Sequence, residues 1–245
     1  MPNTKSPDIT GLASTYAIGT RIDYHSHSAH QLVHAISGTM RVSTENATWF
    51  VPQGRALWIP AGEPHAINCI GEVKMRSAYF SKTYEPELNG VTLTSTSALM
   101  REILVRLAEH EDVPMKRQLA EVLLGEIGAR KLAPFKVPIP NQPKIAFLIE
   151  QLQNFPDDKR SLSHWAKALG YSERSLIRHL RSETGLGFRE LRRLIRVLVS
   201  MEKLAFNSSV TQTALEVGFE TPSAFIHAFK VITGRTPRQL MREDR

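Results

Sequence analysis

The sequence contains a single cysteine, Cys69, in 245 residues, so no disulfide can form within the chain. It also lacks any run of about 18 consecutive apolar residues, which excludes a transmembrane helix at the level of sequence. The N-terminal residues MPNTKSPDIT show no basic region followed by an apolar stretch, so we expect no signal peptide. These absences together predict a cytoplasmic protein without a membrane partner.

The excess of basic over acidic residues lies almost entirely in the C-terminal part of the chain. Residues 141–245 carry 17 Lys and Arg residues, 12 of them Arg, against 11 Asp and Glu, whereas residues 1–140 carry 14 against 13. A basic excess of this kind favours a polyanionic partner, with double-stranded DNA as the leading candidate. A basic surface that only keeps the protein soluble is the alternative.

Prolines mark a domain boundary. The segment 132–143 contains Pro134, Pro138, Pro140 and Pro143, so it cannot continue a helix and predicts an extended linker. Residues 16–80 before it form short β-branched and aromatic runs interrupted by Gly or Pro, which indicates strands. We therefore predict a two-domain α+β protein, with a sensor barrel over 1–94, amphipathic helices over 95–131, the linker over 132–143 and an all-α domain over 144–245.

The helices predicted over 95–131 carry apolar stripes at four-residue spacing, Leu99, Ile103 and Leu107 in one and Leu119, Leu123 and Ile127 in the other. Such stripes can pack on the barrel or on a second subunit. A homodimer through these helices is therefore one hypothesis.

The C-terminal domain contains an internal repeat. The pattern Thr184-Gly185-x-x-x-Arg189-x-Leu191-x-Arg193 recurs as Thr233-Gly234-x-x-x-Arg238-x-Leu240-x-Arg242, at an offset of 49 residues. Gly170-Tyr171 likewise recurs as Gly218-Phe219. Repetition on this scale indicates one supersecondary unit used twice.

Each repeat predicts a helix, a tight turn and a second helix. The N-caps we expect are Ser161, Ser172, Ser209 and Thr221, the last followed by Pro222 at the first helical position. Gly170 and Gly218 make the turns. Two helix-turn-helix units therefore follow one another in the chain.

The second helix of such a unit enters the major groove of DNA. In the first unit the outward positions are Arg174, Ser175, Ile177 and Arg178. An arginine there can bind guanine with two hydrogen bonds, and an isoleucine can contact a thymine methyl group. In the second unit the outward positions are Ser223, Ala224 and His227, which predict less base readout and more phosphate positioning.

Residues 188–206 between the units predict one long amphipathic helix. At about 1.5 Å per residue it spans nearly 30 Å, close to the roughly 34 Å between successive major grooves on one DNA face. The two readers can therefore contact adjacent grooves from one monomer.

Residues 141–245 resemble the AraC/XylS family of transcriptional regulators. ALGYSERSLIRHLRSETG is similar to the family's first unit, and ALEVGFETPSAFIHAFKVITGRTPRQLMR is similar to its signature second unit. The resemblance implies base contacts from Arg174, Ile177 and Arg178, and from Pro222, Ser223, Ala224 and His227. Pro222 and Ala224 have no polar side-chain group, so these two positions of the second helix cannot recognise bases through side-chain hydrogen bonds.

The N-terminal region resembles the cupin superfamily. Its first motif is similar to Gly19, His25, His27, Gln31 and Gly38, with Gln where the family usually has Glu. Its second motif is similar to Gly54, Pro60-Ala61-Gly62 and His65, but Cys69 stands where the family has Asn. The resemblance implies a small barrel with these side chains at its centre.

These side chains are suited to hold a divalent transition metal. If His25 and His27 lie on one strand, they point to the same face, where His65 can add a third imidazole and Gln31 an oxygen ligand. Neutral Gln binds metal more weakly than Glu. The alternative is that the histidines line a pocket for a small-molecule effector, or fill the core, without metal.

Three functions remain. The leading one is a DNA-binding transcription regulator, activator or repressor, controlled by an effector in the barrel; an activator also contacts RNA polymerase. The second is a metal-dependent cupin enzyme with a DNA-binding appendage, which Gln31 and the missing Asn disfavour, so we predict no enzymatic activity. The third is a DNA-binding protein whose barrel is only a dimerisation scaffold.

Overall fold

The computed structural model describes residues 9–84, 88, 90–110, 114–129, 136–205 and 209–242. By their contacts these residues form two compact units. The first contains the described residues up to Thr44 and from Phe50 to Ala129, and the second contains Glu45–Trp49 and the residues from Lys136 onward.

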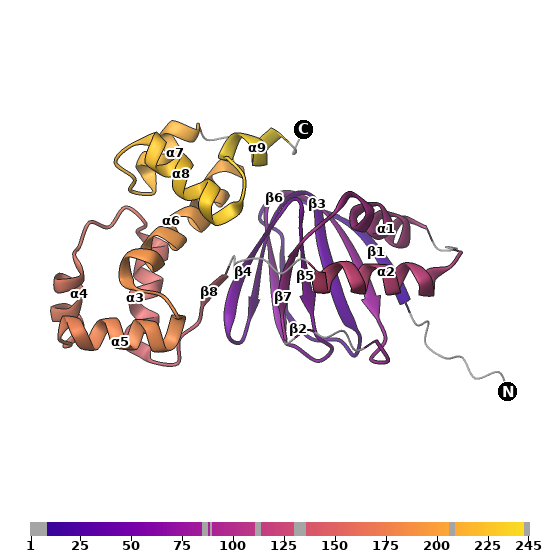
Figure 1. The fold of residues 1–245 in the computed structure, drawn as a ribbon, viewed down its shortest axis with the longest axis horizontal. Coiled ribbons are helices and arrows are strands. Elements are labelled where there is room, and N and C mark those ends of the chain that lie inside the picture. The colour runs from indigo at the N-terminus through magenta and orange to yellow at the C-terminus, as the bar shows by residue number, and fades with distance from the viewer. Residues whose placement is uncertain are drawn as a thin grey trace. The chain divides into compact units, whose positions relative to one another are not determined.

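The first unit is built on an antiparallel sheet (Figure 1). Its strands are β1 (Ile9–Tyr16), β2 (Arg21–His25), β3 (His30–Thr44), β4 (Ala47–Pro52), β5 (Arg55–Ile59), β6 (His65–Phe80) and β7 (Thr92–Ser95), and of β4 the residues up to Trp49 belong to the second unit. The strands β3 and β6 are the longest and pair along almost their whole lengths. β1 and β2 both pair with β6, and β5 lies between β3 and β7.

The pairing of β3 with β6 shifts register between Ala35 and Thr39, where the two strands bend. Gly38 in this bulge has a φ of +80°, and a Cβ atom there would lie 2.3 Å from the carbonyl oxygen of Glu72. Glycine is required because the backbone conformation and the close approach both exclude a side chain. The bend separates the part of β6 that pairs with β2 from the part that pairs with β1.

Two helices, α1 (Ala98–Glu109) and α2 (Lys116–Ala129), cover one face of this sheet (Figure 1). Ile103 and Leu107 of α1, and Leu123 and Ile127 of α2, are buried in one cluster with Trp58 and other residues of the sheet. Of the two predicted uses of the apolar stripes, packing on the barrel is therefore the one observed. Leu99, the first residue of the α1 stripe, is 54% exposed.

The second unit is helical, apart from the short strand β8 (Lys136–Pro138), which pairs with the start of β4. Its helices are α3 (Pro143–Asn154), α4 (Leu162–Leu169), α5 (Glu173–Thr184), α6 (Phe188–Ala205), α7 (Val210–Glu216), α8 (Pro222–Thr233) and α9 (Pro237–Arg242). The predicted linker thus contains a paired strand, and its last residue, Pro143, begins α3. The linker residues 132–135 lie outside the described part of the chain.

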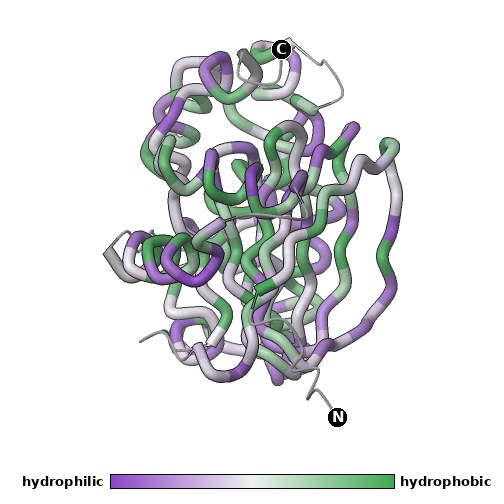
Figure 2. Tube along the Cα trace, turned by 90° about the vertical axis from the view of Figure 1, so that its right-hand side faces the viewer, coloured by the Kyte–Doolittle hydropathy of each residue, from purple (hydrophilic) through white to green (hydrophobic). Residues whose placement is uncertain are grey.

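The long helix α6 organises the second unit. It contacts α3 and α5 along one part and α7, α8 and α9 along another (Figure 1). Leu191, Ile195 and Leu198 on its inner side are buried. Figure 2 shows helical turns that carry both hydrophobic and hydrophilic residues, as amphipathic helices do. The prediction of one continuous spacer helix is confirmed as far as Ala205, and Phe206 lies outside the described residues.

Among the described residues, no helix has the length and apolar character needed to cross a membrane.

Candidate DNA interface and histidine cluster

The first helix-turn-helix unit consists of α4 and α5. The backbone N–H of His164 donates to the Ser161 hydroxyl at 3.1 Å, and that of Ser175 donates to the Ser172 hydroxyl at 3.1 Å, so both predicted N-caps are confirmed. Gly170 ends α4 in the left-handed conformation, with a φ of +71°. The buried Leu176 and Leu180 hold α5 against the core of the unit, which leaves its other side open.

The second unit, α7 and α8, repeats this construction. Ser209 caps α7 by accepting from Gln212 N–H at 3.0 Å, and Thr221 caps α8 by accepting from Ala224 N–H at 3.2 Å. Pro222 stands at the first turn of α8. Phe225 and Phe229 of the same helix are fully buried and anchor it to the core. Local capping chemistry therefore starts α5 and α8 in the same way.

The structure leaves most of the predicted DNA-contacting side chains accessible. Arg174 and Arg178 on α5 are exposed, and Ser175 and Ile177 are partly buried beside them. On α8, Ser223, Ala224 and His227 are exposed. The two sets differ in reach, because α5 presents guanidinium groups and α8 presents one imidazole and two short side chains.

A groove of about 650 Å³ lies along α5, lined by Ser172, Arg174, Ser175, Ile177, Arg178 and Arg181. Arg181, which sequence reasoning missed, follows Arg174 and Arg178 on the same side of the helix. The signal was available, because residues three and four apart share a helix face. Three arginines on one groove make a strongly basic surface suited to DNA phosphates and guanine edges.

Some of the basic excess in this domain serves the fold instead. Arg192 and Arg196 of α6 donate to backbone carbonyls of the loop between α3 and α4, and Arg160 in that loop pairs with the carboxylate of Asp158. Burial acts to raise the pKa of Asp158, but two hydrogen bonds from Arg160 outweigh it and lower that pKa. Net charge therefore overstates the number of arginines available to DNA.

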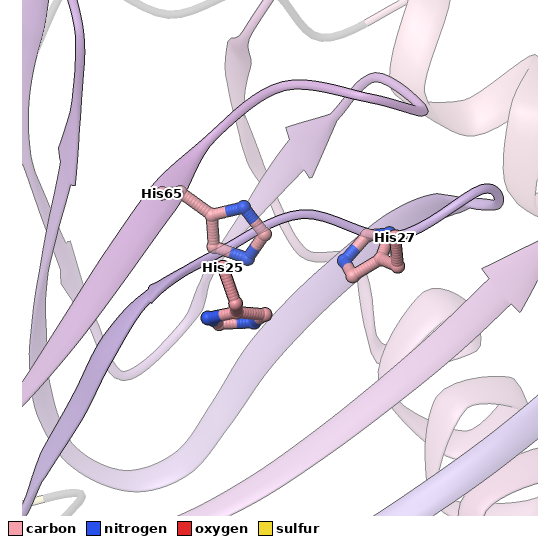
Figure 3. Close-up of side chains that lie close together, drawn as sticks. All are labelled: His25, His27 and His65. Carbon is pink, nitrogen blue, oxygen red and sulfur yellow. The ribbon is translucent and has the colours of Figure 1, made fainter.

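The second candidate site lies in the N-terminal unit that carries the sheet. There, a ring nitrogen from each of His25, His27 and His65 lies within 4.8 Å of the others (Figure 3). The centroids of the His25 and His65 rings are 4.3 Å apart, and those of His27 and His65 are 5.2 Å apart. His65 is fully buried, whereas His25 is exposed, so the cluster is open to solvent on one side.

The three histidines converge as expected, but the predicted reason for their convergence was wrong. The strand β2 ends at His25, so His27 lies in the following loop and does not share a strand face with it. The N–H of Gly62 donates to the carbonyl of His27 at 2.9 Å, which ties that loop to the turn before β6. This contact, and not strand alternation, positions His27.

The ring orientations are fixed by backbone carbonyls. The Nδ1 atoms of His25, His27 and His65 lie 2.8, 2.6 and 2.9 Å from the carbonyl oxygens of Asp23, Ala29 and Glu63. A carbonyl oxygen only accepts, so each Nδ1 carries a proton, and in the neutral form of each ring the Nε2 atom is bare. Such atoms are suited to bind a metal ion or to accept a hydrogen bond.

Gln31 joins the cluster from β3. Its Nε2 donates to the hydroxyl groups of Ser77 and Tyr79, both at 3.0 Å, and this turns its Oε1 toward His27 Nε2 at 3.2 Å. Ser77 and Tyr79 were missed by sequence reasoning, because only the pairing of β3 with β6 brings them beside Gln31. They hold the amide group of Gln31 in place from β6.

The interior position of His65 affects its ionisation. Burial lowers its pKa, the hydrogen bond to Glu63 acts in the opposite direction, and the neighbouring His25 and His27 lower it further. Its Nε2 is buried and has no hydrogen-bond partner among the described residues. A neutral imidazole with a bare buried nitrogen is the state that a metal ion requires.

Comparisons with known proteins agree with both halves of this description. Residues 6–126 match the family described as the AraC-like ligand binding domain, and residues 165–243 match a helix-turn-helix domain family. The HTH-type transcriptional regulator NimR of Escherichia coli (strain K12) is 30% identical over 223 residues, covering 87% of this chain and 80% of NimR.

A second relative, the HTH-type transcriptional regulator RipA of Corynebacterium glutamicum, is 36% identical over 100 residues, or 41% of this chain and 30% of RipA. A solved structure of ToxT from Vibrio cholerae aligns over 96% of this chain and 98% of its own, with 11% identity and a TM-score of 0.43. The family matches and the extent of the likeness to NimR show the family of this chain. The chain belongs to the AraC family of transcriptional regulators, with an N-terminal ligand-binding domain and C-terminal helix-turn-helix units.

Proposed function

We propose that this regulator contacts two adjacent major grooves of its operator with α5 and α8. The observation that carries the proposal is the equivalent construction of the two helices, each started by a hydroxyl cap and each packed on the same helix, α6. The eighteen residues of α6 span about 27 Å, at about 1.5 Å per residue. That length is compatible with binding sites one DNA turn apart.

The two helices have different roles in this proposal. Arg174 and Arg178 on α5 read bases, with Ser175 and Ile177 beside them, because guanidinium groups reach guanine with two hydrogen bonds. Ser223, Ala224 and His227 on α8 offer shorter side chains, which position the helix on phosphates. Specificity therefore rests mainly on the half-site bound by α5.

The experiment is to select duplex DNA from a random library with the full chain and to sequence the bound fraction. The expected result is a pair of half-sites separated by about one helical turn, with the more sharply defined half-site bound by α5. A single half-site without a partner at fixed spacing would overturn the two-groove proposal.

The cluster of His25, His27, Gln31 and His65 is proposed as the effector site. His27 Nε2 and Gln31 Oε1 lie 3.2 Å apart. That separation fits two ligands on one divalent transition metal, which are about 3.0–3.5 Å apart when each bond is near 2.1 Å. The bare, buried Nε2 of His65 also fits this use.

A metal bound by these four residues would supply a positive charge and a coordination position on the solvent side, toward the exposed His25. A small-molecule effector with a donor atom could then reach that position. The alternative is a metal-free cluster in which His27 and Gln31 are hydrogen-bonded to each other. Metal content of the purified protein, with His65→Ala as control, separates the two: the metal proposal fails if Zn²⁺, Mn²⁺ and Ni²⁺ bind both proteins equally.

We also propose that the protein is not an enzyme and acts in the cytoplasm, where bacterial DNA lies. The relatives NimR and RipA, both described as transcriptional regulators, support this proposal. Turnover of a small molecule that disappears with His25→Ala would contradict it.

A homodimer through residues 95–131 stays a prediction, for which α1 and α2 offer the exposed Leu99 and Val122. Sedimentation velocity at micromolar concentration, with Leu99→Glu as the control, tests it. Contact with RNA polymerase is expected only if the protein activates transcription, and a reconstituted transcription assay on the selected operator decides between activation and repression.

A further inference from the structure

Arg196, at the middle of α6, connects the two helix-turn-helix units. Its Nε donates to the carbonyl oxygen of Pro156 at 2.8 Å, and its Nη2 donates to that of Asp158 at 3.2 Å. Both acceptors belong to the loop between α3 and α4, which leads into the first unit. One turn earlier on α6, Arg192 donates to the carbonyl of Arg160 in the same loop.

The other side of Arg196 faces the second unit. A Cβ atom at Gly218, in the turn between α7 and α8, would lie 2.8 Å from Arg196 Nη2 and 2.7 Å from Asp157 Cα. The ring centroid of Phe219 is 5.9 Å from Arg196 Cζ. The turn of the second unit therefore packs directly on Arg196 and on the loop of the first unit.

The equivalent glycine of the first unit provides the contrast. Gly170 also has a positive φ, of +71°, but a Cβ atom there would approach only the flexible end of Lys144, at 3.6 Å. The glycine at 170 is needed for its backbone conformation alone. At 218 a second requirement is added, because the packing between the units leaves no room for a side chain.

Nearby acidic residues stabilise the positive charge of Arg196 in this position. Burial lowers its pKa, while Asp157, Asp158 and Glu220 act to raise it and stabilise the cation. Asp157 and Asp158 belong to the loop of the first unit and Glu220 to the turn of the second. An arginine that donates to two backbone carbonyls within the domain is not available to bind a DNA phosphate.

We propose that Arg196 is a positioning residue that fixes the two helix-turn-helix units in one relative arrangement, so that α5 and α8 engage a single duplex together. The inference rests on the proposed binding of two grooves. A rigid pair of readers gains affinity because binding of the first presents the second at high effective concentration. Without this contact, α5 and α8 each stay folded. When one of them is bound, however, the other is less well oriented toward the adjacent groove.

The test uses the full chain and three DNA fragments: the operator selected by the wild type, the same fragment with the half-site for α8 scrambled, and the operator lengthened by about five base pairs between half-sites, half a helical turn. For wild type, the intact operator is expected to bind best by a wide margin. For Arg196→Leu, the ratio of affinities for two half-sites over one is expected to fall about tenfold. This variant should also bind the intact and the lengthened operators with similar affinities.

Two further variants separate positioning from folding. Arg196→Lys can donate to one carbonyl but not to both with the planar geometry of guanidinium, so an intermediate loss is expected. Gly218→Ala and Gly170→Ala both place a side chain at positive φ, but only the first disturbs the packing between units. Gly218→Ala should therefore reduce the preference for two half-sites, whereas Gly170→Ala should keep it. If Arg196→Leu does not fold, this comparison tests the positioning role in its place.

The outcomes are distinguishable. If the wild type shows no preference for two half-sites, the proposed two-groove binding fails. If the wild type shows it and Arg196→Leu and Gly218→Ala keep it in full, the positioning role fails and the two-groove binding stands. Equal losses on one and two half-sites would mean that Arg196 acts only through folding or a DNA contact, which also overturns the inference.

Discussion

The Nδ1 atom of His34 donates to the carbonyl oxygen of Arg55 at 2.8 Å in the interior of the first unit, outside the histidine cluster. Burial lowers the pKa of His34 from 6.5 to about 4; the hydrogen bond to Arg55 acts to raise it, and the charges of Arg101 and Arg76 lower it further. The folded protein therefore keeps this ring neutral under conditions in which the unfolded chain protonates it.

This difference predicts acid sensitivity. Below pH 6.5 the unfolded state binds a proton at His34 that the folded state does not bind until about pH 4, so the free energy of unfolding falls as the pH falls through this window. The contribution lost by pH 5 is about 2 kcal/mol. Urea unfolding at pH 7.5, 6 and 5 measures it.

The control is His34→Asn, whose amide can still donate to Arg55 but cannot titrate. The variant should be less stable at pH 7.5, because it leaves a cavity, and its stability should depend less on pH. His65 is present in both proteins and contributes equally. Parallel pH profiles for wild type and variant would show that His34 is not the titrating group.

A charge change at Gln31 should strengthen metal binding. Gln31→Glu replaces the neutral oxygen ligand by a carboxylate, and the hydroxyl groups of Ser77 and Tyr79 can rotate to donate to it. We expect Zn²⁺ affinity to rise by about tenfold or more, equivalent to about 1.4 kcal/mol. Competition with a chelating dye at fixed pH measures the change.

Gln31→Leu, which removes the oxygen ligand, is the matched control and should weaken Zn²⁺ binding. Equal affinities in wild type, Gln31→Glu and Gln31→Leu would mean that this side chain takes no part in binding the metal.

Local signals explain what could be predicted from the sequence. A hydroxyl residue before a helix and a glycine after it act within a few residues, so the caps at Ser161, Ser172 and Thr221 and the turn at Gly170 were all predictable. The repeat then predicted the second unit from the first. The site histidines were found because their spacing resembles a known motif.

Contacts between distant segments explain what could not be predicted. Ser77 and Tyr79 are 46 and 48 residues from Gln31 in sequence, and only the register of β3 against β6 brings them together. Arg192 and Arg196 look like DNA-binding residues in a basic sequence. Their internal partners lie in a loop more than thirty residues earlier, which no periodicity reveals.

Base recognition by α5 predicts a specific defect. Arg174→Ala or Arg178→Ala should relax the preference at one operator position and cost about 1–3 kcal/mol of binding free energy for each lost bidentate contact. The measurement is binding to single-base variants of the selected operator at fixed salt, by fluorescence anisotropy.

Arg117→Ala provides the charge-matched control, because Arg117 is 77% exposed on α2, in the N-terminal ligand-binding domain. It should leave base preference unchanged. A variant of Arg174 that weakens all operator sequences equally, with a shallower salt dependence, would reassign that residue to phosphate contact.

The contact between α1 and β1 gives a prediction about the ligand-binding domain. A Cβ atom at Gly11 would lie 1.9 Å from the carbonyl oxygen of Leu107 and 2.7 Å from Ala108 Cα, so α1 packs directly on the backbone of β1. Because both neighbouring atoms are backbone, Gly11→Ala can be accommodated only if α1 and β1 move apart. We expect a loss of about 3 kcal/mol, the upper end of overpacking effects.

Gly125 on α2 is the matched site, because a Cβ atom there would have nothing within 4 Å. Gly125→Ala should raise stability by about 0.5–1 kcal/mol, since alanine loses less backbone entropy than glycine in a helix. Thermal unfolding measures both changes, and hydrogen exchange shows whether the amides of α1 lose protection in Gly11→Ala. Unchanged protection in α1 would mean that β1 yields instead of the helix, because one of the two must move to admit the methyl group.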